Sequence, residues 1–157
     1  MADRTIAALS GELVSLVQEV PAFSEGCFSV FDLSDLKVKS NHQAFPVVGV
    51  SFDGAVPNPG NQATPANSAS RSTALVLIQF SVILGLQYNF SGQDDTKPHG
   101  TNLLDDLRTR ISGYQGVNNR PWVWVGEKPE DDASDDGIIF YSQTWRTTVA
   151  SVGKFNS

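Results

Sequence analysis

The sequence contains one cysteine, Cys27, and only two histidines, His42 and His99, among its 157 residues. A single cysteine excludes an internal disulfide and gives no reason to invoke an oxidising compartment. Neither histidine has a second histidine or a cysteine nearby at the spacing of metal ligands. Cys27 begins an apolar segment, so we expect a small buried residue there rather than a nucleophile. No cofactor or metal is therefore expected.

Basic residues and long apolar runs are also scarce. Eleven Lys and Arg face 17 Asp and Glu, which gives a net charge of −6 and disfavours general binding to a phosphate backbone. The longest apolar run, residues 74–78, is far shorter than the ~20 residues that cross a bilayer. Asp3 and Glu12 interrupt the N-terminal stretch, so no signal peptide is expected. The composition predicts a soluble globular chain forming one domain over residues 1–157.

Motifs for common enzyme chemistry are missing too. The sequence has no Gly-x-Ser-x-Gly nucleophile turn, no Walker phosphate loop and no Gly-x-Gly-x-x-Gly dinucleotide motif. The composition therefore predicts a protein that is not an enzyme.

Hydrophobic periodicity predicts two helices. In residues 3–20, apolar side chains recur every three or four positions, with Asp3 as a candidate N-cap and a proline at the end. Residues 102–111 place leucines on one face, with Asn102 as a candidate cap and Gly113 as the stop. Within this second helix, Asp106 and Arg110 have the spacing of an ion pair.

Alternation predicts about five strands: residues 27–33, 48–53, 72–87, 121–127 and Ile138–Val149. The second strand, residues 48–53, is expected to be half-buried. The polar residues 37–43 are expected to form a loop before it. The third has apolar residues at every even position from Ala74 to Leu86, and Gly85 is a candidate bulge. Runs of strands with separate helices predict an α+β fold, a mostly antiparallel sheet packed by two helices.

Residues 54–70 are uncharged, rich in proline and glycine, and poor in side chains that could form a core. They predict a long loop or arm, which in a compact domain is either functional or a flexible surface loop. The residues we expect to dock on a partner are Pro57, Asn58, Pro59, Gln62 and Pro65.

Residues 127–136 contain six carboxylates, those of Glu127, Glu130, Asp131, Asp132, Asp135 and Asp136. Starting at Asp132 they partly match a calcium loop, but the twelfth position is Gln143, where a bidentate glutamate belongs. A hydrolase pair would require one desolvated acid, which a run of adjacent carboxylates does not favour. The Asp-Gly pair before an alternating strand indicates a hairpin turn with a solvated acidic tip.

Trp122 and Trp124 share one face of their predicted strand, because side chains alternate with a period of two. Most aromatic residues in such positions belong to the core. A pair on one face of a terminal strand is also suited to a contact between subunits, and the sequence leaves both interpretations open.

The C-terminal half resembles the tail-terminator, or tail-completion, proteins of contractile-tailed, Mu-like bacteriophages. The resemblance lies in "TNLLDDLRTRISGYQ" (101–115) and "WVWVGEKPEDDASDDGIIFYSQTWRTTV" (122–149), a leucine-containing helix followed by a hairpin with an acidic turn and a long aromatic strand. The element order fits most of the chain. The arm at 54–70 and the tryptophan pair have no counterpart in the family pattern.

This resemblance implies a structural virion protein that forms a ring, commonly a hexamer, on the head-proximal end of the tail tube. Its partners would be other copies of itself, the tail tube, the sheath and the neck or connector proteins. DNA would pass through the ring without specific binding, past a lumen that Asp131, Asp132, Asp135 and Asp136 could face. Such a protein assembles in the host cytoplasm and ends at the tail–neck junction. Alternatives are another neck, connector or baseplate subunit and, more distantly, a calcium-binding module.

Overall fold

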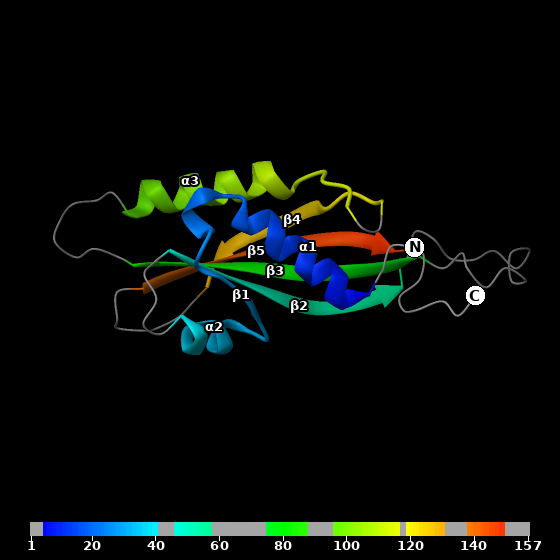
Figure 1. Cartoon of the computed structure of the whole chain (residues 1–157), viewed down its shortest axis with the longest axis horizontal. Helices are drawn as coiled ribbons and strands as arrows, with labels where there is room; N and C mark the ends of the chain where they lie inside the picture. The colour runs from blue at the N-terminus through cyan, green and yellow to red at the C-terminus, as the bar shows by residue number, and fades with distance from the viewer. Residues whose placement is uncertain are drawn as a thin grey trace, which may run out of the picture.

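The structure, a computed structural model, describes residues 5–40, 46–57, 75–87, 96–116, 119–130 and 138–149. They form a five-stranded sheet with helices on both faces (Figure 1). The elements in chain order are α1 (Ile6–Gln18), a 3-10 turn (Pro21–Phe23), β1 (Cys27–Val30), α2 (Leu33–Lys39), β2 (Val47–Pro57), β3 (Val76–Gln87), α3 (Thr96–Ile111), β4 (Val123–Pro129) and β5 (Ile138–Val149).

The strands lie side by side in the order β1-β2-β3-β5-β4. The β1–β2 pair is parallel, and the other three pairs are antiparallel. This arrangement confirms the predicted α+β fold with a mostly antiparallel sheet. The β4–β5 hairpin is also present, with Trp124 opposite Trp145 and Pro129 opposite Tyr141.

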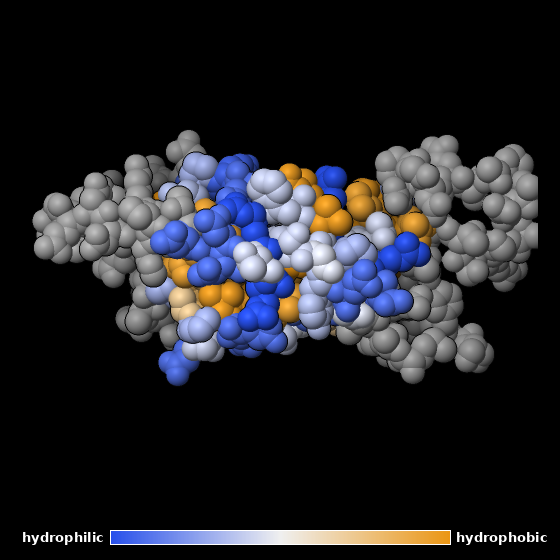
Figure 2. Space-filling model, turned by 90° about the horizontal axis from the view of Figure 1, so that it is seen from above, coloured by the Kyte–Doolittle hydropathy of each residue, from blue (hydrophilic) through white to orange (hydrophobic). Residues whose placement is uncertain are grey.

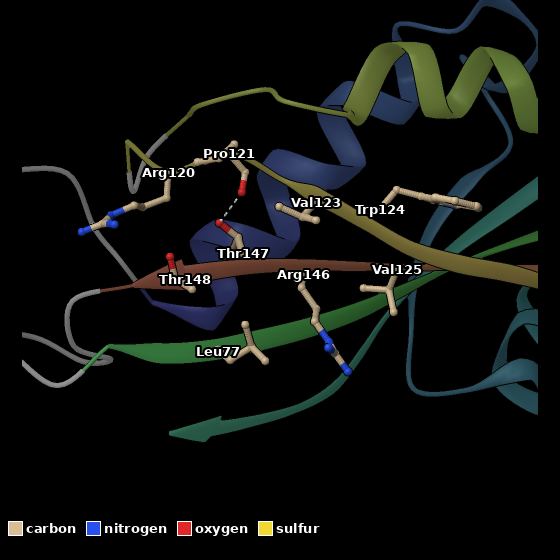
Figure 3. A pocket seen from close by; sticks show the side chains of 9 residues that line it. All are labelled: Leu77, Arg120, Pro121, Val123, Trp124, Val125, Arg146, Thr147 and Thr148. Atoms are coloured by element: carbon tan, nitrogen blue, oxygen red, sulfur yellow. Dashed lines mark hydrogen bonds between the residues drawn. The ribbon is translucent and has the colours of Figure 1, made fainter. Parts of the chain in front are cut away.

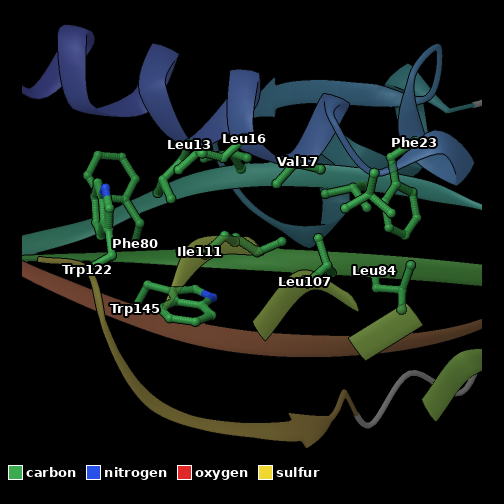
Figure 4. Packing of buried hydrophobic residues seen from close by; sticks show 14 of the residues in the cluster. Leu13, Leu16, Val17, Phe23, Phe80, Leu84, Leu107, Ile111, Trp122 and Trp145 are labelled. Carbon is green, nitrogen blue, oxygen red and sulfur yellow. The ribbon is translucent and has the colours of Figure 1, made fainter. Parts of the chain in front are cut away.

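The main core lies between the sheet and the two long helices (Figure 4). α1 contributes Leu9, Leu13, Leu16 and Val17, and α3 contributes its four predicted inward residues, Leu103, Leu104, Leu107 and Ile111. The even positions of β3 from Ile78 to Leu86 are buried against them, as their alternation predicts. Each fully buried aliphatic side chain contributes about 1.5–3 kcal/mol of hydrophobic stabilisation, so this layer dominates the stability of the fold.

A third helix, α2, covers part of the opposite face and was not predicted. Its start is fixed locally, because Asp32 accepts a hydrogen bond from the Asp35 amide at 2.9 Å. The Asp35 carboxylate in turn accepts one from the Phe31 amide, which together with Lys39 lowers its pKa. Leu33, expected as the end of a strand, and residues 37–39, expected as part of a loop, are therefore helical.

α2 packs Leu36 into a second, smaller cluster with Val30, Val47, Ile83 and Phe140. These side chains lie on the face of the sheet opposite α1 and α3, as the placement of α2 in Figure 1 shows. Both faces of the first half of β2 are consequently buried, from Val47 to Ser51. The expectation of a half-buried strand was wrong there, because it did not include α2.

Several predicted boundaries also move. The N-cap of α1 is Thr5, whose side chain accepts from the Ala8 amide at 3.1 Å, and not Asp3. α3 begins at Thr96, so Asn102 lies inside the helix and does not cap it. Gly113 follows the helix with a φ of +79°, which favours glycine, as expected at a helix end.

Charged residues on α3 also differ from expectation. Arg110 forms its ion pair with Glu19, beyond the end of α1, at 3.4 Å, rather than with Asp106. This contact ties the two long helices together at the surface, although an exposed pair of this kind contributes little stability.

Gly85 is not a bulge. The register of β3 is continuous through it, and the sheet is irregular instead between Phe52 and Gly54 and between Trp124 and Gly126. A Cβ at Gly85 would lie 2.9 Å from Cε1 of Phe140, so the glycine makes room for the aromatic ring.

The predicted arm at 54–70 begins later than expected, because β2 continues through Pro57 and pairs with β3 there. Residues 58–70 lie outside the described part of the chain. Among the described helices, none is both long and apolar enough to cross a membrane.

Candidate functional site

Among the described elements, no helix covers one end of the sheet on the face opposite α1 and α3. Alternation along the strands places Val56 of β2, Leu77 of β3 and Val123 of β4 on this open face. α2 packs against the other end of the same face, near Phe140 and Ile83. Val56 and Val123 are more than half exposed, so this end of the sheet carries uncovered apolar surface.

The open end is hollowed into a groove of about 600 Å³. It runs along the first residues of β4 and the last residues of β5, as Figure 3 shows. Its lining is formed by Leu77, Arg120, Pro121, Val123, Trp124, Val125, Arg146, Thr147 and Thr148. Thr147 donates a hydrogen bond to the Pro121 carbonyl at 3.2 Å, which holds the segment before β4 against β5.

The groove combines apolar walls with two guanidinium groups. Arg146 donates from Nε to the Gln79 side-chain oxygen at 2.9 Å. Arg120 is exposed at the rim. Within the described ranges neither arginine has a carboxylate partner, so both keep donors for a ligand. A surface that combines apolar side chains with planar guanidinium groups is suited to binding an acidic peptide segment.

β4 is an edge strand of the sheet, and its first three residues are exposed and apolar. Val123, Trp124 and Val125 are 55%, 43% and 42% exposed. The irregular register after Trp124 and the Lys128–Pro129 end interrupt the edge, which limits strand addition by another chain. The exposed side chains remain available for contact through the groove and the rim.

Trp122 and Trp124 have different environments. Trp122 is 1% exposed, packs edge-on against Phe80 and donates from Nε1 to Glu12 at 2.7 Å. With so little surface it cannot contact a neighbouring subunit, so the core interpretation holds for Trp122. Trp124 lies under the guanidinium of Arg108, 5.7 Å from the ring centroid, with much of its side chain exposed. The contact interpretation stays open only for Trp124.

A polar network anchors β4 behind the groove. Arg108 of α3 pairs with Glu127 of β4 at 2.5 Å and also with Asp105. Gln143, fully buried, donates to the Leu104 carbonyl and to Glu127, and accepts from Trp145 Nε1. The network joins α3, β4 and β5, and so holds the wall of the groove in place.

The same network argues against the calcium interpretation. The amide of Gln143, which would supply the twelfth ligand, is committed to bonds inside the fold. Among the described residues no group of three or more His, Cys, Asp or Glu side chains is placed to hold a metal. The rest of the acidic segment, including Asp131, Asp132, Asp135 and Asp136, lies outside the described residues.

Cys27 is partly buried beneath α1, with its Sγ 4.0 Å from the Val14 carbonyl. Burial raises the pKa of the Cys27 thiol to about 12. A thiol that stays protonated is a poor nucleophile, in agreement with the expected structural role.

Of the predicted site residues that the structure describes, Pro57, Trp122 and Trp124, only Trp124 lines the groove. Pro57 ends β2, whereas Asn58, Pro59, Gln62 and Pro65 lie outside the described part. Sequence patterns missed Arg120 and Arg146, because they are far apart in the chain and only the Val123–Arg146 pairing of the hairpin brings them together. The alternation of Ile138–Val149 could have placed Arg146 on the face opposite Trp145.

Comparison with known proteins gives little guidance. No family model matches the sequence, and no curated protein matches it. Among solved structures, a chain from the virion of a native gene transfer agent particle is similar at a TM-score of 0.49 and 10% identity. The match covers 87% of this chain and 83% of that chain. A likeness this distant carries no argument about function.

Proposed function

We propose that the chain is a structural subunit of a tailed, phage-like particle, and that it forms the ring that terminates the tail tube. The observation that carries the proposal is the exposed start of β4, where three successive apolar residues flank the groove. Contiguous apolar surface around a hollow is typical of a protein–protein interface. The same hairpin resembles that of tail-terminator proteins, and this resemblance is the reason for proposing a ring on a tail tube.

A ring requires an interface between two different surfaces of each subunit, related by a rotation that closes. The groove at one end of the sheet offers one such surface. The net charge of −6 suits a ring around DNA, because an acidic protein does not hold the phosphate backbone. The ring is proposed as a hexamer at the tail–neck junction, assembled in the host cytoplasm.

The proposed partners are other copies of the chain, the tail tube, the sheath and the neck or connector proteins. The segment 54–70 is the proposed arm for one of these contacts, beginning where β2 ends at Pro57. An uncharged, proline-rich segment can order when it binds, which would let it follow the surface of a neighbour.

Electron microscopy of tail tubes polymerised with and without the purified protein tests the proposal. We expect a ring at one end of each tube and shorter tubes as its concentration rises. Tubes of unchanged length with no bound protein would contradict a terminator. Cryo-EM of intact particles separates this role from another neck, connector or baseplate subunit, because each occupies a different level of the tail.

A further inference from the structure

We propose that the groove binds the acidic segment 130–136 of a second copy of this chain. The groove therefore provides one half of a head-to-tail contact, and the hairpin tip provides the other. The inference rests on the proposed ring, and it names the two surfaces through which neighbouring subunits meet.

The chemistry of the groove selects an acidic peptide. Val123, Val125 and Leu77 provide apolar contact, and the side chain of Arg146 extends from β5 across β3 (Figure 3). The bond from Arg146 Nε to Gln79 orients the guanidinium and leaves its two terminal nitrogens for a carboxylate. Arg120, exposed in the segment before β4, adds a second positive charge to the lining. Because Gln79 already holds the guanidinium of Arg146, that group loses less conformational entropy on binding a ligand than a free arginine side chain would.

The chain itself contains the complementary charge. Of the six carboxylates in residues 127–136, Glu127 is already bonded to Arg108 and Gln143. The other five, from Glu130 to Asp136, have no arginine or lysine between them in the sequence. No other stretch of the chain is as acidic, so it is the part of the sequence whose charge best complements the two arginines of the groove.

The hairpin separates the two surfaces by the length of its strands. The acidic segment joins β4 and β5 at Glu130 and Ile138, whereas the groove lies where β4 begins and β5 ends. Ile138 and Arg146 are separated by about 26 Å along an extended strand. The middle of segment 131–137 extends at most about 14 Å from the strand ends.

A subunit therefore cannot fill its own groove with its own tip. The contact must join two copies, and because it joins unlike surfaces it is heterologous. Repetition of this contact produces a closed ring or a filament, depending on the rotation between copies. The proposed function requires the ring.

The test uses two neutralised variants of the full chain. The groove variant carries Arg120→Gln and Arg146→Gln. The tip variant carries Asp131→Asn, Asp132→Asn, Asp135→Asn and Asp136→Asn, which keep side-chain size. Arg110→Gln and Asp106→Asn are the matched controls, since both residues lie on the exposed side of α3 away from the groove. Far-ultraviolet circular dichroism and thermal unfolding confirm that each variant folds.

Analytical ultracentrifugation over a concentration series measures self-association. We expect the wild type and both controls to form the same oligomer. Each neutralised variant should associate at least about tenfold more weakly, because a lost charge contact at an interface costs more than one factor of ten. Added salt should weaken the wild-type oligomer as well, since the rim of the groove is exposed.

Mixing the two variants gives the sharpest outcome. The groove variant keeps an intact tip and the tip variant keeps an intact groove, so one contact can form in each mixed pair. We expect complexes that stop at two chains, because the remaining surfaces are both neutralised. A symmetric interface would not produce this pattern.

Two results would overturn the inference. If the tip variant assembled as well as the wild type, the carboxylates would instead be free to face the lumen and repel DNA. The ring proposal would survive that result. If the wild type remained monomeric over the whole series, copies would not dock through the groove, and the tube-binding experiment above would decide the terminator role separately.

Discussion

At the scale of single residues, Trp122 and Trp124 show how two similar side chains acquire different roles. They lie two positions apart and point to the same side of the sheet, toward α3. Trp122 reaches the core beside Phe80, whereas Trp124 lies at the edge under Arg108. Burial, and not the face of the strand, separates a stabilising residue from a contact residue.

This difference predicts a large loss of stability for one alanine variant and a weaker self-association for the other. Trp122→Ala should lower the free energy of unfolding by about 3–5 kcal/mol, because it leaves a large cavity and removes the hydrogen bond from Trp122 Nε1 to Glu12. Trp124→Ala should cost roughly 1 kcal/mol or less, mostly from the lost contact with Arg108, but should weaken self-association. Urea unfolding and sedimentation measure the two effects. Equal losses of stability would contradict the assignment of Trp124 to the surface.

Cys27 provides a second test at this scale. Its pKa of about 12 leaves the folded thiol almost fully protonated at pH 8. Alkylation by iodoacetamide should therefore be slower in the folded protein than in urea, by roughly a thousandfold from the thiolate fraction alone. Mass spectrometry of timed samples follows the reaction. Rapid modification of the folded chain would show that Cys27 is exposed and reactive.

At the scale of elements, Gln143 connects α3, β4 and β5 through one buried amide. The variant Gln143→Leu keeps the volume but leaves Trp145 Nε1 and the Leu104 carbonyl without this partner. Unsatisfied buried groups cost about 1–3 kcal/mol each, so the free energy of unfolding should fall by at least that amount. The urea midpoint at constant slope measures it.

Thr144→Val is the matched control for this variant. Thr144 is the next residue of β5, is only half-buried and points to the other face. Its replacement should change the free energy of unfolding by about 0.5 kcal/mol or less. A Gln143→Leu variant as stable as this control would show that the network does not hold β4.

Elements with strong periodicity could be predicted from the sequence. The even positions of β3 and the leucines of α3 are each sufficient to identify an element and its buried face. α2 could not be predicted in this way, because it is short and buries only Leu36. The start of α3 was missed because residues 96–101 include Pro98 and Gly100, which disfavour helix in local patterns.

The groove could not be predicted from any local pattern. It depends on the register of β4 against β5, which places Val123 opposite Arg146, and on the irregularity after Trp124. The register of a hairpin depends on the packing of both strands. The sequence of one strand therefore does not show which residues of the other strand will lie opposite its own. The acidic segment could be recognised, but its partner surface could not.

At the scale of the whole molecule, the two ends of the sheet differ in what covers them. Helices α1 and α3 cover one face with a mixture of hydrophilic and hydrophobic surface (Figure 2), and α2 covers one end of the other face. The groove lies at the start of β4 and the end of β5, whereas the strand ends at Pro129 and Ile138 lie at the far end of the same strands. A subunit with unlike surfaces at its two ends is suited to head-to-tail assembly.

We propose that copies of this chain close into a ring that caps a tail tube. Mass photometry of the purified protein, alone and mixed with assembled tail tubes, tests it most directly. We predict a single oligomer of defined copy number, six by the family resemblance, in solution or on the tubes. A protein that stayed monomeric both alone and with tubes would contradict the claim.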